Sequence, residues 1–255
     1  MSDIKSSIQV IIFGKRNATD LPGVLRDISA SGYDAFETGN LLDHRSESEV
    51  RLLLEENKLS ISGIHLGYGD YANEKRVGEH IAFCKKFNVK NMMCSGVSDP
   101  TTITGYEETA LLFDKVGARL RDEGIAFNYH NHNWEFNDLG GVNGMQILAT
   151  QTNPALVKFN IDVFWVTMGK EDPANFIKMH ASRAGYFHFK DGYQKDDGSF
   201  VFTELGKGKI DLRGAMRAAL EVGIQWMVYE QDHTDGDPTQ SAAISRDYMR
   251  DILGV

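Results

Sequence analysis

Thiols and prolines are scarce in this sequence, which has two cysteines and five prolines among its 255 residues. Cys84 and Cys94 form no CxxC pair, which argues against both a zinc–thiolate site and a disulfide framework. We expect the two side chains to be small buried hydrophobes of the core. Any metal bound by this chain would therefore be held by imidazole and carboxylate groups.

Long apolar runs and basic clusters are also missing. The apolar run within MSDIKSSIQVIIFG ends at Gly14 and is too short for a signal peptide or a membrane span, so we expect a cytoplasmic protein with no membrane partner. The 27 basic residues are outnumbered by 36 acidic ones, and no Lys/Arg-rich run follows the length of a phosphate backbone. This balance argues against nucleic acid as a partner.

Short apolar runs alternate with amphipathic stretches along the whole chain, in eight pairs. Apolar residues make up 42% of the sequence and charged residues 25%, as in ordinary globular proteins. The expected strands are 8–13, 33–38, 61–66, 91–95, one within 125–136, 157–164, 186–190 and 225–230. The expected helices are 21–31, 46–59, 74–87, 106–122, 142–150, 173–182, 212–222 and 240–253.

Eight such repeats with nearly continuous apolar strands and no linker predict an α/β protein, a single parallel (β/α)8 TIM barrel over residues 1–255. A doubly wound open sheet is the alternative. It fits less well, because the first strand-to-helix turn, FGKRNATDLPG, has no GxGxxG fingerprint and no Walker lysine. Gly206 and Gly208 resemble a phosphate loop, but we interpret them as a plain turn.

Ionisable residues gather at the carboxyl ends of the predicted strands, where the active site of a TIM barrel lies. The amino ends carry nothing comparable. The residues at the carboxyl ends are Glu37, His65, His130, His132, Asp162, His188, Lys190, Asp191 and Glu230. This one-sided distribution predicts a metal or catalytic site on that rim.

The stretch IAFNYHNHNWEF, residues 125–136, supplies the densest part of the rim. Alternation along a strand sends His130 and His132 to the same face, and Glu135 follows within reach. Imidazoles and carboxylates are costly to bury unless something pairs with them, and a divalent metal is the usual partner. Hydrogen-bonded polar residues on a loop are the alternative interpretation.

Three further sites have their own alternatives. Asp162 lies between Ile161 and Val163, where an unpaired carboxylate would be expensive, so we expect a ligand. His188, between two phenylalanines, is expected to be a ligand because Asp162 lies on the adjacent strand. Lys190 is either catalytic or paired with Asp191, and Glu37 and His65 are either substrate contacts or rim hydrogen bonds.

YHNHNWEF, NIDVFW, FHFKD and VYEQ, in this order, resemble strands five to eight of the sugar phosphate isomerase/epimerase family, the xylose isomerase-like TIM barrels. The resemblance covers nearly the whole chain. It implies a divalent ion (manganese, cobalt, magnesium or zinc) held by a carboxylate from strand five, an aspartate, a histidine and a glutamate. The last three correspond to Asp162, His188 and Glu230. Many relatives have a glutamate where His130 falls, so the strand-five ligand is either His130 or Glu135.

The residues and the resemblance together predict a metal-dependent sugar or keto-polyol isomerase or epimerase that works through an enediolate. Glu230 or Glu135 would remove an α proton, and His132, Lys190 or His65 would move protons or stabilise the oxyanion. The alternatives are a keto-polyol dehydratase on the same site and a barrel that binds a sugar without converting it. An endonuclease IV-like activity on DNA is disfavoured by the few histidines and the acidic charge. The resemblance also implies a homo-oligomer.

Overall fold

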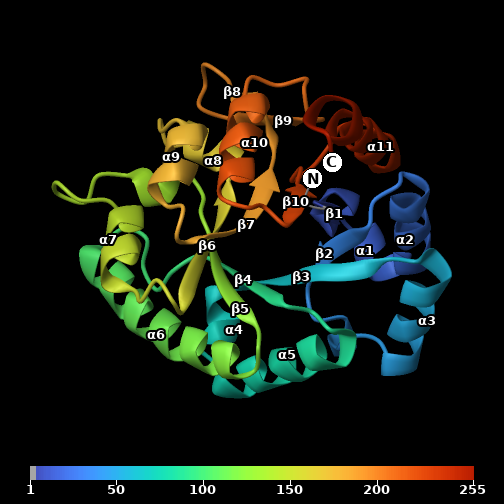
Figure 1. Ribbon diagram of the computed structural model, residues 1–255, viewed down its shortest axis with the longest axis horizontal. Helices are drawn as coiled ribbons and strands as arrows, with labels where there is room; N and C mark the ends of the chain where they lie inside the picture. Colours follow the sequence, from blue (N-terminus) through green and yellow to red (C-terminus); the bar gives the residue numbers. More distant parts are fainter. Residues whose placement is uncertain (1–3) are drawn as a thin grey trace.

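The computed structural model describes residues 4–255, and its main feature is a closed barrel of eight parallel strands (Figure 1). Each strand pairs with the next along the chain, and β1 pairs with β10 to close the ring. The strands are β1 (Lys5–Gln9), β2 (Ala35–Thr38), β3 (Ser60–Gly67), β4 (Asn91–Ser95), β5 (Ala126–His130), β6 (Val157–Asp162), β7 (Ala184–Phe189) and β10 (Trp226–Tyr229). The predicted (β/α)8 barrel is confirmed.

Helices follow the strands and form the outer layer of the barrel. The longer ones are α2 (Leu21–Ala30), α3 (Glu47–Asn57), α5 (Glu74–Phe87), α6 (Ile103–Asp122), α7 (Gly144–Gln151), α9 (Pro173–Met179), α10 (Leu212–Glu221) and α11 (Pro238–Tyr248). Their starts carry the expected signals. Ser46 and Glu49 form the predicted capping box of α3, and Pro173 occupies the first turn of α9.

Short helical turns lie in the connections between these elements, and the last of them directly follows α11. They are η1 (Val10–Phe13), α1 (Arg16–Thr19), η2 (Leu41–Asp43), α4 (Tyr68–Tyr71), η3 (Trp134–Phe136), α8 (Val163–Met168) and η4 (Met249–Leu253). Among residues 4–255, no helix is both long and apolar enough to cross a bilayer.

Two predicted strands end two or more residues earlier than expected, in each case where a side chain caps a helical turn. The first strand was expected at 8–13, but it ends at Gln9, whose side chain accepts the N–H of Ile11 and opens η1. The sixth was expected to reach Phe164, but it ends at Asp162, whose carboxylate accepts the N–H of Trp165 and opens α8. Apolar content alone does not reveal such caps.

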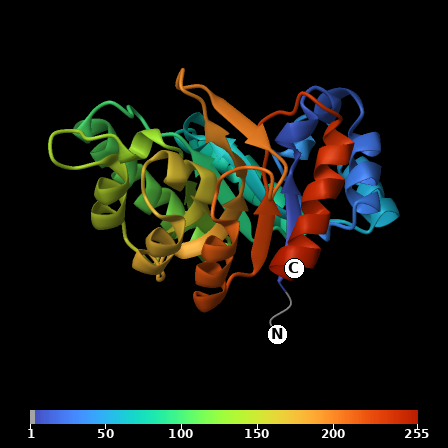
Figure 2. The ribbon, with the colours of Figure 1, turned by 90° about the horizontal axis from the view of Figure 1, so that it is seen from above.

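The polar excursion after β7 is the tip of a hairpin that the sequence interpretation missed. Strands β8 (Asp191–Gln194) and β9 (Phe200–Thr203) are antiparallel, and the hairpin projects from the barrel in Figure 2. Phe202 packs on Phe164, with ring centroids 5.3 Å apart, and Phe200 packs on Trp165 at 5.0 Å. The hairpin therefore covers α8 beside the carboxyl end of the barrel.

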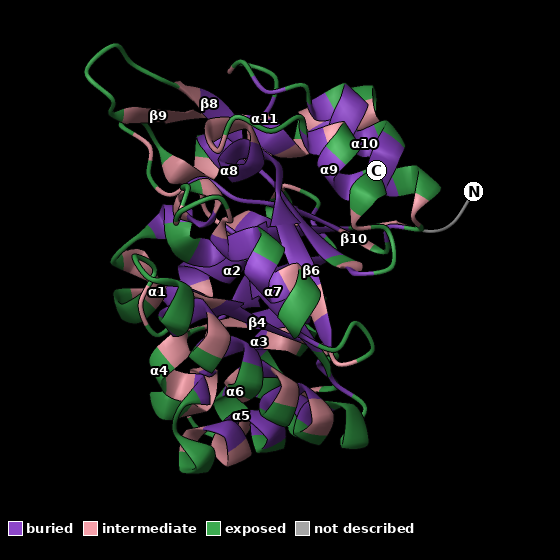
Figure 3. Ribbon diagram, turned by 90° about the vertical axis from the view of Figure 1, so that its left-hand side faces the viewer, coloured by how far each residue is buried: buried purple, intermediate pink, exposed green. Residues whose placement is uncertain are grey.

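The two ends of the barrel interior differ: the amino end is filled by packed side chains, and the carboxyl end is polar and open. The barrel strands are buried along most of their length, whereas the helices expose their outer faces (Figure 3). Toward the amino ends, the hydroxyls of Ser7 and Tyr186 both contact the Ser62 hydroxyl, at 2.7 and 2.8 Å, and Met93 and Val228 pack beside Tyr186. This layer fills the barrel from below, so the interior is open to ligands only at the carboxyl end.

Candidate active site

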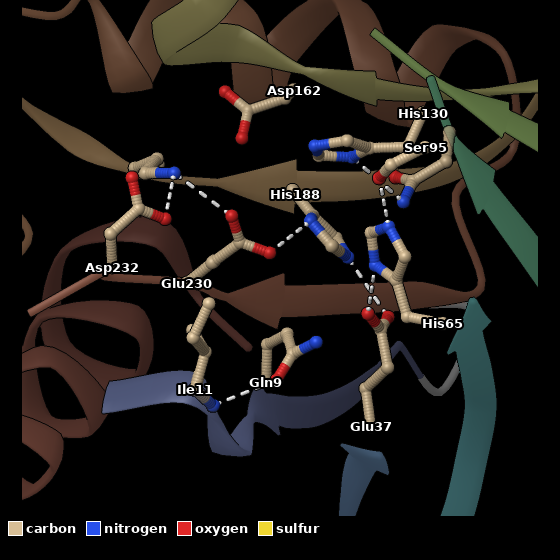
Figure 4. A network of polar contacts seen from close by, with 12 residues as sticks. Gln9, Ile11, Glu37, His65, Ser95, His130, Asp162, His188, Glu230 and Asp232 are labelled. Carbon is tan, nitrogen blue, oxygen red and sulfur yellow. Dashed lines mark hydrogen bonds and ion pairs between the residues drawn. The ribbon is translucent and has the colours of Figure 1, made fainter. Parts of the chain in front are cut away.

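Each of the eight barrel strands places one polar side chain in a single layer at the carboxyl end of the interior (Figure 4). Because side chains alternate along a strand, His188 points the same way as the interior residue Tyr186, and Glu230 the same way as Val228. The eight residues, in strand order, are Gln9, Glu37, His65, Ser95, His130, Asp162, His188 and Glu230.

Six of these eight residues were expected at the rim, and Gln9 and Ser95 were not. The first strand was expected at 8–13, which puts Gln9 near its start. In the structure Gln9 is the last residue of the strand, at the carboxyl end. Ser95 is the last residue of a strand with correctly predicted bounds, so its position was available. A serine hydroxyl does not titrate, so Ser95 does not belong to the pattern of ionisable residues at the strand ends.

Four of the eight side chains form a group that could hold a metal ion. His130, Asp162, His188 and Glu230 each offer one ligand atom, and these atoms lie within 4.8 Å of one another. All four residues are buried. Imidazole and carboxylate donors of this kind suit first-row divalent ions such as zinc, iron and manganese.

Two of these buried donor atoms lack hydrogen-bond partners. Their hydrogen bonding therefore indicates whether a cation would fit among them. Asp162 Oδ2 and His188 Nδ1 are buried and have no hydrogen bond within the described chain. His188 Nδ1 lies 2.7 Å from Glu230 Oε2, yet this contact lacks hydrogen-bond geometry. Unpartnered polar atoms are expensive to bury, and a shared cation would satisfy both of them. The donor set therefore fits a divalent metal.

The histidines among the candidate ligands each have one ring nitrogen in contact with a neighbouring polar side chain. His188 Nε2 lies 2.8 Å from Glu37 Oε2, and the second oxygen of Glu37 lies 2.8 Å from His65 Nδ1. His65 Nε2 also contacts the Ser95 hydroxyl. A carboxylate behind a histidine fixes its ring and raises its strength as a ligand. Glu37 thus orients His188, and it is not among the residues that line the cavity above the layer.

His130 has a comparable support in Asn160 of β6, whose amide nitrogen lies 3.2 Å from His130 Nδ1. Asn160 Oδ1 has no partner. Turning the amide over would place this oxygen against an Nδ1–H and leave the Nε2 lone pair available to a metal.

Charges in the layer shift the pKa values of the candidate ligands strongly. Burial alone would lower the pKa of His188, but the carboxylates of Glu37 and Glu230 outweigh it and raise this pKa to about 10. Burial would raise the pKa of Glu37, and the two histidines that contact it instead lower it to about 2. Burial raises the pKa of Asp162 to about 7 against the opposing charge of Lys190. In the metal-free chain a proton on His188 therefore stands between two carboxylates.

Lys190 lies at the next position after β7 and is fully buried. Its ammonium group contacts Glu230 Oε1 at 2.9 Å and Asp232 Oδ1 at 2.7 Å, and it lies 4.8 Å from the ring centroid of Trp165. Burial would lower the pKa of Lys190, but the surrounding carboxylates raise it. Lys190 is thus a charged group that holds Glu230. The alternative prediction, an ion pair with the adjacent Asp191, is wrong, because the partners are Glu230 and Asp232.

A cavity of about 270 Å³ opens over the layer. His132 borders it and stacks on Trp134, with ring centroids 3.9 Å apart and planes 12° from parallel. Burial and the charge of Lys190 lower the pKa of His132 to about 3, so the ring is neutral, and its Nδ1 has no partner. The lining residues are Gln9, Ile11, His65, Leu66, Gly67, Ser95, His130, His132, Glu230 and Asp232.

The family model for xylose isomerase-like TIM barrels matches residues 25–252, nearly the whole chain. The chain belongs to this family. The xylose isomerase-like barrel is 27% identical to inosose dehydratase of Lacticaseibacillus casei over 173 residues, which cover 59% of this chain and 55% of that protein. It spans about half the length of the curated relatives it matches.

Solved structures share the fold over nearly the full length of the xylose isomerase-like barrel. A sugar phosphate isomerase/epimerase from Parabacteroides distasonis superposes with a TM-score of 0.82 at 19% identity and covers 97% of this chain and 94% of its own. The IOLI protein, solved with a zinc atom, gives a TM-score of 0.76 at 14% identity and covers 98% of each chain. At these identities the likeness shows the fold.

Glu135, the second expected strand-five ligand, belongs to none of the possible metal-holding groups among residues 4–255. It is buried, and its oxygens accept the Tyr129 hydroxyl at 2.5 Å and the His132 backbone N–H at 2.8 Å. Tyr129 packs on Phe113 of α6, so this pair lies between the sheet and the helix layer. The turn after β5 carries Glu135 away from the barrel interior, so of the two expected candidates only His130 lies in the group that could hold a metal.

Proposed function

We propose that this chain is a divalent-metal-dependent sugar or keto-polyol isomerase or epimerase that removes and returns a proton next to a carbonyl group. The observation that carries the proposal is the buried group His130, Asp162, His188 and Glu230, in which Asp162 Oδ2 and His188 Nδ1 have no hydrogen-bond partner. These four residues would hold the ion. A bound divalent ion would polarise the substrate carbonyl and stabilise the negative charge that develops when the α proton leaves.

The chain itself supplies two groups that can carry the proton, and both line the cavity. His132 is in the neutral form that can accept a proton, although burial and Lys190 lower its pKa to about 3 and make it a weak base. Glu230 stands elsewhere on the cavity wall, with one oxygen held by Lys190. Return of the proton to the opposite face gives an epimer, and return to the neighbouring carbon gives an isomer. Glu135 has no part in this proposal, because its oxygens are engaged outside the cavity.

A keto-polyol dehydratase is the second candidate, and the relationship to inosose dehydratase favours it. The first step would be the same proton removal. The difference would lie in the loss of a β-hydroxyl group, which needs a proton donor on the leaving-group side. His65, which lines the cavity, and Lys190, which contacts Glu230 and Asp232 of the cavity wall, would be the donors.

Metal analysis tests the metal site directly. We expect the purified protein to carry about one divalent ion per chain and His188→Ala to carry almost none, because the variant loses a buried ligand. His44→Ala is the matched control, since His44 is exposed and lies outside every possible metal-holding group. Equal metal content in wild type and His188→Ala would contradict the proposed centre.

Isotope exchange tests the chemistry. The metal-loaded protein should exchange the α proton of a ketose with D₂O, as followed by NMR over a panel of pentuloses, hexuloses and inososes. His132→Gln should retain the metal and lower the exchange rate roughly 10²- to 10⁴-fold, the usual contribution of a general base. Exchange on no member of the panel would reject proton transfer, and sugar binding without exchange would instead indicate a non-catalytic barrel.

A further inference from the structure

The connection from β7 to α10 lies at the same end of the barrel as the site, and its sequence looks suited to a phosphate group. It contains the segment ELGKGKID, residues 204–211, with two glycines and two lysines. TIM-barrel enzymes that act on phosphorylated substrates frequently hold the phosphate with backbone N–H groups of the loops that follow strands seven and eight. This connection follows the seventh barrel strand.

The backbone N–H groups of this connection are already occupied by an anion from the chain itself. The carboxylate of Asp191 accepts the N–H groups of Gly192 at 2.8 Å, Gly206 at 2.8 Å, Gly208 at 3.0 Å and Ile210 at 3.2 Å. Asp191 is buried, with 1% of its surface exposed. Four convergent N–H donors form the kind of concavity in which proteins bind phosphate.

The loop is shaped around this carboxylate. Gly206 has a φ of +83°, in the region that favours glycine. A Cβ atom at Gly208 would lie 2.1 Å from Asp191 Oδ1, so only glycine allows the backbone to approach the carboxylate this closely. The glycines of the segment therefore serve the internal anion and leave no N–H group of this set for an external one.

We propose that Asp191 closes the phosphate-binding position of this barrel, and that the substrate is an uncharged keto-sugar or keto-polyol, not a sugar phosphate. The proposal rests on the function proposed above and names its substrate class. Asp191 is a specificity-determining residue in this view, because it fills a place that a substrate phosphate would otherwise need.

The cations near the mouth support the same conclusion. Lys190 is neutralised by Glu230 and Asp232. Arg76, which borders a neighbouring cavity of about 610 Å³, is paired with Asp43, Asp70 and Glu79. The two cavities share Leu66 in their walls.

Arg45 is the one Lys or Arg lining either cavity that has no ion pair among residues 4–255, and it borders the outer cavity. Two carboxylates, Glu230 and Asp232, line the inner cavity, and none of its lining residues among 4–255 is a Lys or Arg, so its wall would repel a phosphate.

Inorganic phosphate is the probe for a test that needs no catalytic activity. Thermal unfolding is followed in phosphate and in chloride at equal ionic strength, with and without a chelator, because phosphate held by a bound metal disappears on chelation. Wild-type protein with chelator should show no phosphate-dependent rise in Tm. A rise would reveal an open phosphate site and overturn the proposal, and its loss in Arg45→Ala would locate that site in the outer cavity.

Asp191→Ala should free the four N–H groups, so that millimolar phosphate raises its Tm by roughly 3 °C or more. Asp197→Ala, which removes an exposed aspartate from the hairpin tip, is the matched control and should not respond. If Asp191→Ala folds only in phosphate, this rescue supports the proposal. Folded Asp191→Ala with no response to phosphate would overturn it, and if the variant folds in neither buffer, the wild-type result decides.

A second experiment compares a neutral ketose with its phosphate ester in the D₂O exchange assay. The ester should react with a kcat/KM at least about tenfold lower, because its charge meets carboxylates and finds no open site. An ester that reacts as well or better would overturn the substrate assignment. If neither compound exchanges, the proposed function fails, while the phosphate-binding results still decide the role of Asp191.

Discussion

His130 and Glu135 are five residues apart, and the direction of the chain between them determines which can meet a metal. His130 ends β5 on its inner face, beside Asn160 of β6. Glu135 lies beyond the strand and returns to the hydroxyl of Tyr129 on the outer face. The alternation of a strand can be predicted from sequence, but the path of the four residues that follow it depends on tertiary contacts. The sequence therefore left both candidates open.

Glu135→Gln should keep the metal and change how stability depends on pH. Burial raises the pKa of Glu135 to about 7 from an ordinary 4.5, so the folded chain binds this proton more tightly than the unfolded chain does. Its contribution to stability is complete below about pH 4.5 and is lost as the pH rises to about 7. The glutamine stays neutral and can bond both Tyr129 and His132.

Urea denaturation from pH 4 to 8 checks this expectation. The free energy of unfolding of Glu135→Gln, relative to wild type, should rise by up to about 3 kcal/mol across this range and then level off. A difference that does not vary with pH would show that Glu135 is already charged in the folded chain. Loss of the bound metal from the variant would show that its carboxylate is a metal ligand.

Elements with strong local signals were predicted well, and those fixed by a single cap or a distant contact were not. Helix α5 and strand β4 have the predicted bounds, because apolar periodicity and flanking residues coincide there. The start of β1 and the hairpin β8–β9 were missed. β1 begins with Lys5, Ser6 and Ser7, and the Ser7 hydroxyl contacts Ser62 inside the barrel. Apolar content cannot identify such a strand.

Asp162 links two elements, because it ends β6 and caps α8, and two substitutions should separate its roles. Asparagine is as good a cap as aspartate, so Asp162→Asn should lose metal binding without loss of stability in the metal-free protein. Asp162→Ala should lose metal binding and also be about 1 kcal/mol less stable than the asparagine variant. Metal analysis and urea denaturation in chelator measure the two effects. Equal stability of the two variants would show that the cap contributes nothing.

At the scale of the whole molecule, the sequence predicted at which end of the barrel the candidate site lies, but not how its side chains pair with one another. Ionisable residues at the ends of successive strands predicted one active rim, because parallel strands of a barrel end at the same face. The pairing of Glu37 with His65 and His188, and of Lys190 with Asp232, depends on which side chains meet across the barrel. Such contacts between distant residues are set by strand stagger, which apolar patterns do not encode.

Removal of the metal should destabilise the entire barrel, since the empty site leaves Asp162 and Glu230 buried close together. We expect chelation to lower the Tm of the loaded protein by roughly 3 to 10 °C, the effect of losing a ligand bound only by the folded state. Differential scanning calorimetry measures this change. His188→Ala should show almost no response to the chelator, and a wild-type Tm that is insensitive to chelation would argue against a resident ion.

Strand β10 pairs with β1, although nearly the whole chain separates them, and Glu230 directly follows β10. During synthesis on a ribosome, β1 emerges early and has no neighbour on one edge until β10 appears. His130, Asp162 and His188 are likewise made before the last donor of their group. The barrel and the group of four side chains that could hold a metal are therefore completed in one late event, and an unfinished chain would have an open sheet edge and only three of these side chains.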